Sequence, residues 1–111
     1  MSARLQARIV ATALIRRAGQ EGGSATVLKI GDDQSGSIML QCNEKGQFIA
    51  FVERLLNLDG GYAWSRVGPD RSAKMAEIQE YVDRRTRNDP DLWVIELDIP
   101  EPERFAAETI A

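Results

Sequence analysis

The sequence lacks histidine altogether and contains only one cysteine among its 111 residues. Without an imidazole, Ser-His-Asp catalysis, Cys-His catalysis and a histidine metal ligand are excluded. Zinc sites normally draw four ligands mainly from cysteine and histidine, so a structural zinc is excluded too. A single thiol forms no internal disulfide, which fits a reducing cytoplasm. We therefore expect a cytoplasmic protein with no metal and no cofactor.

Long hydrophobic runs and phosphate-binding glycine loops are also missing. The apolar run 9–15 is too short to span a bilayer and is closed by two arginines. The pairs Gly22-Gly23 and Gly60-Gly61 fit neither a Gly-x-x-x-x-Gly-Lys-Ser/Thr frame nor a Gly-x-Gly-x-x-Gly frame. The sequence therefore predicts no membrane span, and both glycine pairs are typical of turns.

Charge is distributed unevenly along a chain whose formal net charge is −3. Residues 1–20 hold four arginines and no acid, whereas residues 89–111 hold seven acids and one arginine. General nucleic-acid affinity needs a concentrated basic face, so the acidic balance makes nucleic acid an unfavoured partner. Opposite charges at the two ends favour attraction within one chain or across a dimer.

Hydrophobic periodicity predicts a helix at each end of a series of strands. The spacing of Val10 and Leu14, beside Leu5, Ile9 and Ala13, predicts a broadly buried helix over 3–19, although the β-branched run 9–12 also fits a strand. A second helix is expected from about 71 to 87, where two acid-before-base pairs stand four residues apart.

Between these helices, alternating residues predict four strands at 26–30, 38–42, 48–56 and 62–67, separated by short turns. The first two read as a hairpin around 31–36. A last strand over 93–99, with one buried face, ends at Pro100 and Pro102 and leaves a short acidic tail. We expect one α+β domain over 1–111, in the order α-β-β-β-β-α-β, with an antiparallel meander sheet and both helices on one face.

The decapeptide Asp-Pro-Asp-Leu-Trp-Val-Ile-Glu-Leu-Asp, at 89–98, resembles the C-terminal signature of a family of short alphaproteobacterial proteins known only as a domain of unknown function. Further matching points are Gly31-Asp32 followed by Gly36, Trp64, and Ala76-Glu77 in the helix before the signature. The resemblance covers nearly the whole chain and implies a shape and a bacterial cytoplasmic setting, but no catalytic residue. Family members tend to continue the last strand into an Asp-Gly turn, which Pro100 and Pro102 replace here.

Tyr62, Trp64 and Arg66 alternate along one predicted strand, so their side chains project from the same sheet face. Residues of these types anchor protein interfaces and can stack nucleic-acid bases, but they also serve simply as packing. Packing is the most economical interpretation, followed by a protein interface.

Asp89 and Asp91 flank Pro90 and could act as paired acid and base groups. The structural interpretation is stronger, because an Asp beside Pro caps local backbone amides in turns. Cys42 lies in the alternating run with Ile38 and Leu40, which predicts a small buried side chain rather than a reactive thiolate.

The sequence selects no reaction, and the chain is more readily a binding protein than an enzyme. The leading hypothesis is a non-catalytic protein-interaction module that binds another protein or a second copy of itself. The alternatives are a small enzyme that uses carboxylates and a domain that binds a small ligand or nucleotide.

Overall fold

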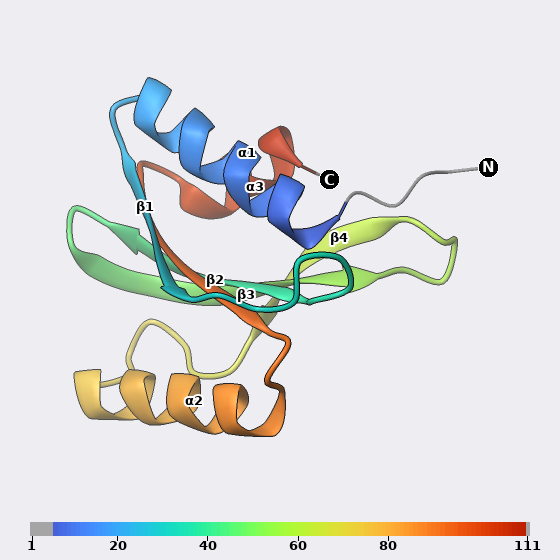
Figure 1. Ribbon diagram of the computed structural model, residues 1–111. Coiled ribbons are helices and arrows are strands. Elements are labelled where there is room, and N and C mark those ends of the chain that lie inside the picture. The colour runs from blue at the N-terminus through green and yellow to red at the C-terminus, as the bar shows by residue number, and fades with distance from the viewer. Residues whose placement is uncertain (1–5, 111) are drawn as a thin grey trace.

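The computed structural model describes residues 6–110, which form one five-stranded sheet and three helices (Figure 1). In chain order the elements are α1 (Ala7–Gln20), β1 (Ser24–Lys29), β2 (Ile38–Glu44), β3 (Gln47–Leu56), β4 (Tyr62–Val67), α2 (Met75–Asn88), β5 (Trp93–Asp98) and α3 (Pro102–Thr109). The α+β class is thereby confirmed. No helix within 6–110 is long and apolar enough to cross a membrane.

The sheet is mixed, which corrects the expectation of a purely antiparallel meander. Its strand order is β1-β5-β2-β3-β4, so the last strand inserts between the first two. β5 pairs antiparallel with β1 and parallel with β2, and β1 and β2 therefore form no hairpin. The β2–β3–β4 part of the predicted meander is present as two antiparallel pairs. A short connection favoured the hairpin, but an extra strand of matching pattern can separate two strands that are adjacent in sequence.

The two predicted helices cover opposite faces of the sheet rather than one (Figure 1). α1 packs on the face that carries Leu40 and Ile95, whereas α2 packs on the face that carries Met39 and Val94. The reason is topological: α2 connects β4, at one edge, to β5 near the other edge, and it runs under the sheet to do so. Consequently β5 begins with both faces buried instead of one.

The first helix has one buried face and one exposed face. Val10 and Leu14 are fully buried against the sheet, while Ile9 is 49% exposed. The predicted broad burial of this helix was therefore wrong on the Ile9 side, and Leu5 lies outside the described residues. The strand alternative for 9–12 is also excluded, because this segment is helical.

The chain ends in a third helix where the sequence predicted only an acidic tail. Pro102 stands at the start of α3, a position at which proline's missing amide and fixed φ are compatible with a helix. Phe105 and Ala106 are buried against the α1 side of the sheet. Two prolines were interpreted as breakers, although proline is common in the first helical turn.

Candidate functional site

The side chains of Tyr62, Trp64 and Arg66 do share one sheet face, and α3 engages two of them. The Trp64 indole Nε1 donates a hydrogen bond to the backbone oxygen of Ile110 over 2.6 Å. The Arg66 guanidinium donates to both carboxylate oxygens of Glu103, over 2.9 and 2.6 Å. This fork raises the pKa of Arg66 and lowers the pKa of Glu103. The hydrogen-bonding groups of Trp64 and Arg66 therefore hold α3 and the residue after it against the sheet.

Tyr62, the third member of the stripe, lies beyond these α3 contacts. The guanidinium carbon of Arg54, on the neighbouring strand, is 4.2 Å from the centre of the Tyr62 ring. Such a separation is typical of a cation–π contact. Tyr62 and Arg54 together form one wall of a surface pocket.

Asp89 and Asp91 lie at the junction of α2 and β5, where both take part in backbone contacts. A carboxylate oxygen of Asp89 accepts a hydrogen bond from the backbone amide of Asp91 over 3.1 Å. The backbone carbonyl of Asp91 accepts from the amide of Asp32 over 3.0 Å. The Asp91 side chain is exposed. The two residues therefore come together through the backbone of a turn, as capping residues do.

The points of family resemblance near the start of β5 are brought into direct contact. A Cβ added at Gly31 would lie 2.1 Å from the backbone oxygen of Asp91, and one added at Gly36 would lie 2.3 Å from the same atom. The Trp93 indole Nε1 donates to the backbone oxygen of Asp32 over 2.7 Å. The loop between β1 and β2 thus packs tightly against the start of β5. Only glycine, which has no Cβ, can approach the Asp91 oxygen this closely.

Asp32 organises this loop from within. Its carboxylate accepts hydrogen bonds from the Ser35 amide, the Ser35 hydroxyl and the Gln34 amide, over 2.9, 3.0 and 3.1 Å. The bonds from Ser35, followed by that from Gln34, lower the pKa of Asp32. The carboxylate is thereby engaged in closing a turn.

Cys42 is completely buried between the sheet and the α1 and α3 layer. Burial is the main reason that the pKa of its thiol is raised to about 12, and the nearby Glu103 carboxylate adds to the effect. A thiol with such a pKa is almost wholly protonated at neutral pH, which makes it a poor nucleophile.

A polar cluster that was not predicted from the sequence joins β3 to α2. The Arg85 guanidinium donates to the carboxylate of Glu53 over 2.8 Å and to the hydroxyl of Tyr81 over 2.9 Å. Burial tends to lower the pKa of Arg85, but the bonds to Glu53 and Tyr81 outweigh it and raise the value. Glu53 is 8% exposed. An acidic residue in an apolar strand was the available signal, since it alternates with Phe51 and so faces the same side of the sheet.

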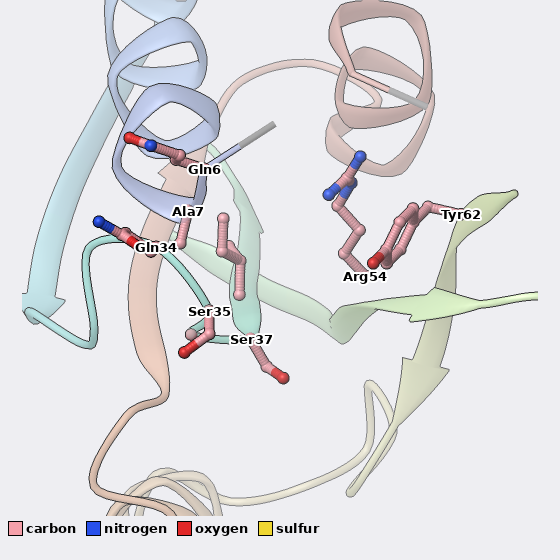
Figure 2. A pocket seen from close by; sticks show the side chains of 9 residues that line it. Gln6, Ala7, Gln34, Ser35, Ser37, Arg54 and Tyr62 are labelled. Carbon is pink, nitrogen blue, oxygen red and sulfur yellow. The ribbon is translucent and has the colours of Figure 1, made fainter. Parts of the chain in front are cut away.

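A pocket of about 300 Å³ opens between the start of α1, the β1–β2 loop and the sheet (Figure 2). Polar groups and Ile38 line most of it, and Arg54 and Tyr62 form the side nearest β4. The carbonyls of Gln34 and Asp33 accept hydrogen bonds from the amides of Ala7 and Arg8. The first amides of α1 are therefore satisfied by the loop rather than directed at a ligand.

Beyond this pocket, the β3–β4 hairpin carries a group of exposed leucines. Leu55, Leu56 and Leu58 are 39%, 60% and 110% exposed. The turn that displays Leu58 is ordered by hydrogen bonds between the backbones of Asn57 and Gly61, and by the side chain of Asp59. Leu56 alternates with Arg54 and pairs with Tyr62, so these three side chains share one face of the sheet, whereas Leu55 points to the opposite face. We refer to Leu56 and Leu58, together with Arg54 and Tyr62, as the hairpin surface. Strands and a turn were predicted here, but the exposure of the leucines, which no helix within residues 6–110 covers, was not.

Three comparisons relate the chain to known proteins. The family model described as "Protein of unknown function (DUF1491)" matches residues 5–107. A search of curated proteins gave no match. Solved structures of similar fold include the crystal structure of a DUF1491 family protein from Caulobacter crescentus CB15, with a TM-score of 0.79 and 27% identity over 92% of this chain and 94% of that one.

Two further solved structures are similar over comparable lengths. The NMR structure of a DUF1491 family protein from Caulobacter crescentus CB15 has a TM-score of 0.76 and 30% identity, over 94% of each chain. The solution structure of protein Atu0922 from A. tumefaciens has a TM-score of 0.72 and 25% identity, over 89% of each chain. The family model covers nearly the whole sequence, and the chain accordingly belongs to the DUF1491 family of proteins of unknown function.

Proposed function

We propose that this protein is a non-catalytic interaction module of the bacterial cytoplasm, and that it binds a partner protein through the hairpin surface. The observation that carries the proposal is the exposure of Leu56 and Leu58 on one ordered hairpin, where Leu56 shares its sheet face with Arg54 and Tyr62. Exposed apolar groups that gather at one place, rather than scatter singly, are typical of binding surfaces. The partner that fits is a protein with an apolar depression that receives Leu58.

The residues beside the leucines have the chemistry of an interface anchor. Arginine and tyrosine are enriched among the residues that contribute most to protein binding. Arg54 and Tyr62 stand against each other beside the pocket (Figure 2). Tyr62 is the cross-strand partner of Leu56, so a partner protein that covers Leu56 also reaches this pair. The stripe residues Trp64 and Arg66 contribute indirectly, because they fix α3 beside this region.

The proposal is tested by affinity capture from lysate of the native organism with wild-type protein and a Leu56→Ser, Leu58→Ser variant. A matched control, Ile9→Ser with Met75→Ser, removes two other exposed apolar side chains. We expect a defined protein to be retained by the wild type and the control and lost from the hairpin variant. Its binding is then measured with the purified pair. Equal retention by all three proteins would contradict the proposed surface.

A second function, binding of a small polar ligand, is favoured by the pocket itself. Its volume of about 300 Å³ is at the lower end of the range for small-molecule sites. Amide and hydroxyl groups of Gln34, Ser35 and Ser37 line it. Native mass spectrometry of freshly purified protein tests this alternative: a reproducible extra mass of a few hundred daltons supports a ligand, whereas the bare mass of the chain speaks against one.

A further inference from the structure

β1 forms the edge of the sheet that lies farthest from the hairpin surface. β1 pairs with β5 on one side and is the outermost strand on the other. Its residues from Ser24 to Leu28 include neither a charged side chain nor a proline. Edge strands are normally protected against pairing with other chains by such residues.

The charged residue of β1, Lys29, binds within its own chain and so does not protect the strand edge. The ammonium group of Lys29 donates hydrogen bonds to the backbone oxygens of Pro90 and Leu92, over 2.6 and 3.1 Å. These bonds hold the lysine over the start of β5, within the same chain. The other edge strand, β4, differs because it carries the charged and exposed Arg66.

An exposed apolar side chain flanks the β1 edge on the α2 side, because Leu28 is 48% exposed. Leu28 lines a groove of about 420 Å³ with Val82 and Thr86 of α2. The register shift between Val27 and Lys29 leaves the strand regular from Ser24 to Val27. An added strand could therefore pair with the regular part and lie beside Leu28.

From these observations we propose that β1 pairs antiparallel with β1 of a second copy of this chain, about a two-fold axis near Thr26. The two five-stranded sheets then form one continuous sheet across the dimer. A strand edge is complementary to itself in this arrangement, because each copy offers the same alternation of donors and acceptors. The run from Ser24 to Leu28 is uncharged, so two copies of an acidic protein meet there without opposing like charges.

This inference goes beyond the proposed function and uses a different surface. The hairpin surface belongs to β3 and β4, at the far side of the sheet from β1 (Figure 1). A dimer formed through β1 leaves the hairpin leucines available. Substitutions at the two surfaces therefore test the two proposals separately.

The test is sedimentation equilibrium of the wild type, Thr26→Lys, Thr26→Asp, and an equimolar mixture of the two variants. Thr26 is exposed, so neither variant disturbs the core, and thermal melts followed by circular dichroism verify folding. We expect a wild-type dimer, and a dissociation constant raised about tenfold or more in each variant, because like charges then face each other. The mixture is expected to recover the dimer through Lys–Asp pairing.

The matched control places the same two substitutions at Thr12, which is exposed on α1. We expect these variants to dimerise like the wild type. A wild-type protein that stays monomeric at all concentrations would overturn the proposal. A dimer that both Thr26 variants leave intact would also overturn it, because the interface would then lie elsewhere.

Discussion

Gly31 and Asp91, sixty residues apart in sequence, are in backbone contact so close that a Cβ at Gly31 would lie 2.1 Å from the Asp91 carbonyl oxygen. The contact fixes the β1–β2 loop against the start of β5, the strand that separates β1 from β2. Gly36 approaches the same oxygen from the other end of the loop. The glycine spacing and the Asp-Pro-Asp-Leu-Trp segment that mark the family resemblance therefore form one packing unit.

Replacement of Gly31 tests this contact. We expect Gly31→Ala to lower the free energy of unfolding by about 1–3 kcal/mol, because a methyl group has no room beside the Asp91 oxygen. Gly19→Ala is the control, since a Cβ there meets nothing within 4 Å and alanine favours the helix by up to about 1 kcal/mol. Urea unfolding of both variants measures the difference, and equal stabilities would contradict the packing described.

The Glu53–Arg85 pair is expected to be costly to break and much less costly to replace. Arg85→Met leaves the buried Glu53 carboxylate without its partner, so we expect a loss of about 3 kcal/mol. The double variant Glu53→Leu, Arg85→Met removes both charges and should recover much of this loss. Denaturant unfolding of the two single variants and the double variant forms a thermodynamic cycle. Strictly additive losses would show that the pair is not coupled.

The Arg66–Glu103 pair should make stability depend on pH in a defined direction. The pKa of Glu103 in the native protein lies below its ordinary value of 4.5, chiefly because Arg66 donates hydrogen bonds to it. The pair therefore stabilises the fold fully above pH 4.5, and its contribution is lost as the pH falls through the lowered native pKa. We expect Arg66→Met to destabilise the protein slightly at pH 7, as is typical of a solvent-screened ion pair, and by less in more acid solution. A difference that stays constant from pH 7 to pH 3 would exclude this role.

The thiol of Cys42 is expected to be unreactive in the native protein. It is fully buried, and its pKa is raised to about 12. In buffer at pH 8 an aromatic disulfide reagent should modify the thiol only slowly, at a rate set by unfolding. In urea the modification should be fast. Rapid modification of the folded protein would show that α3 opens readily from the sheet. The Gly31→Ala variant, if less stable, should react faster than the wild type.

Much of the secondary structure was predictable because periodicity reports burial. The alternation of Ile38, Leu40 and Cys42 gave β2, and Val10 with Leu14 gave the buried face of α1. The position of β5 was not predictable, because pairing depends on which strand edge is available in three dimensions rather than on the strand's own sequence. The face of the sheet that α2 covers was not predictable for the same reason, because it depends on the path that α2 takes from β4 to β5.

The candidate site depended on an element that was missed. The stripe of Tyr62, Trp64 and Arg66 was interpreted first as packing and second as a protein interface, but the helix that Trp64 and Arg66 contact was not expected. The exposure of Leu56 and Leu58 could not be read from the sequence, since apolar residues in a strand are usually covered. Whether Asp89 and Asp91 form a reactive pair stays a prediction; the structure shows their hydrogen bonds to the backbone of the turn.

The most direct measurement of the proposed function is photo-crosslinking in the native cells from a benzoylphenylalanine placed at position 58. Position 75, also an exposed apolar residue but on α2, serves as the control. We predict a covalent adduct of one defined mass from position 58 and none of that mass from position 75. The same adducts from both positions, or none from position 58, would contradict an interaction module that binds through its hairpin.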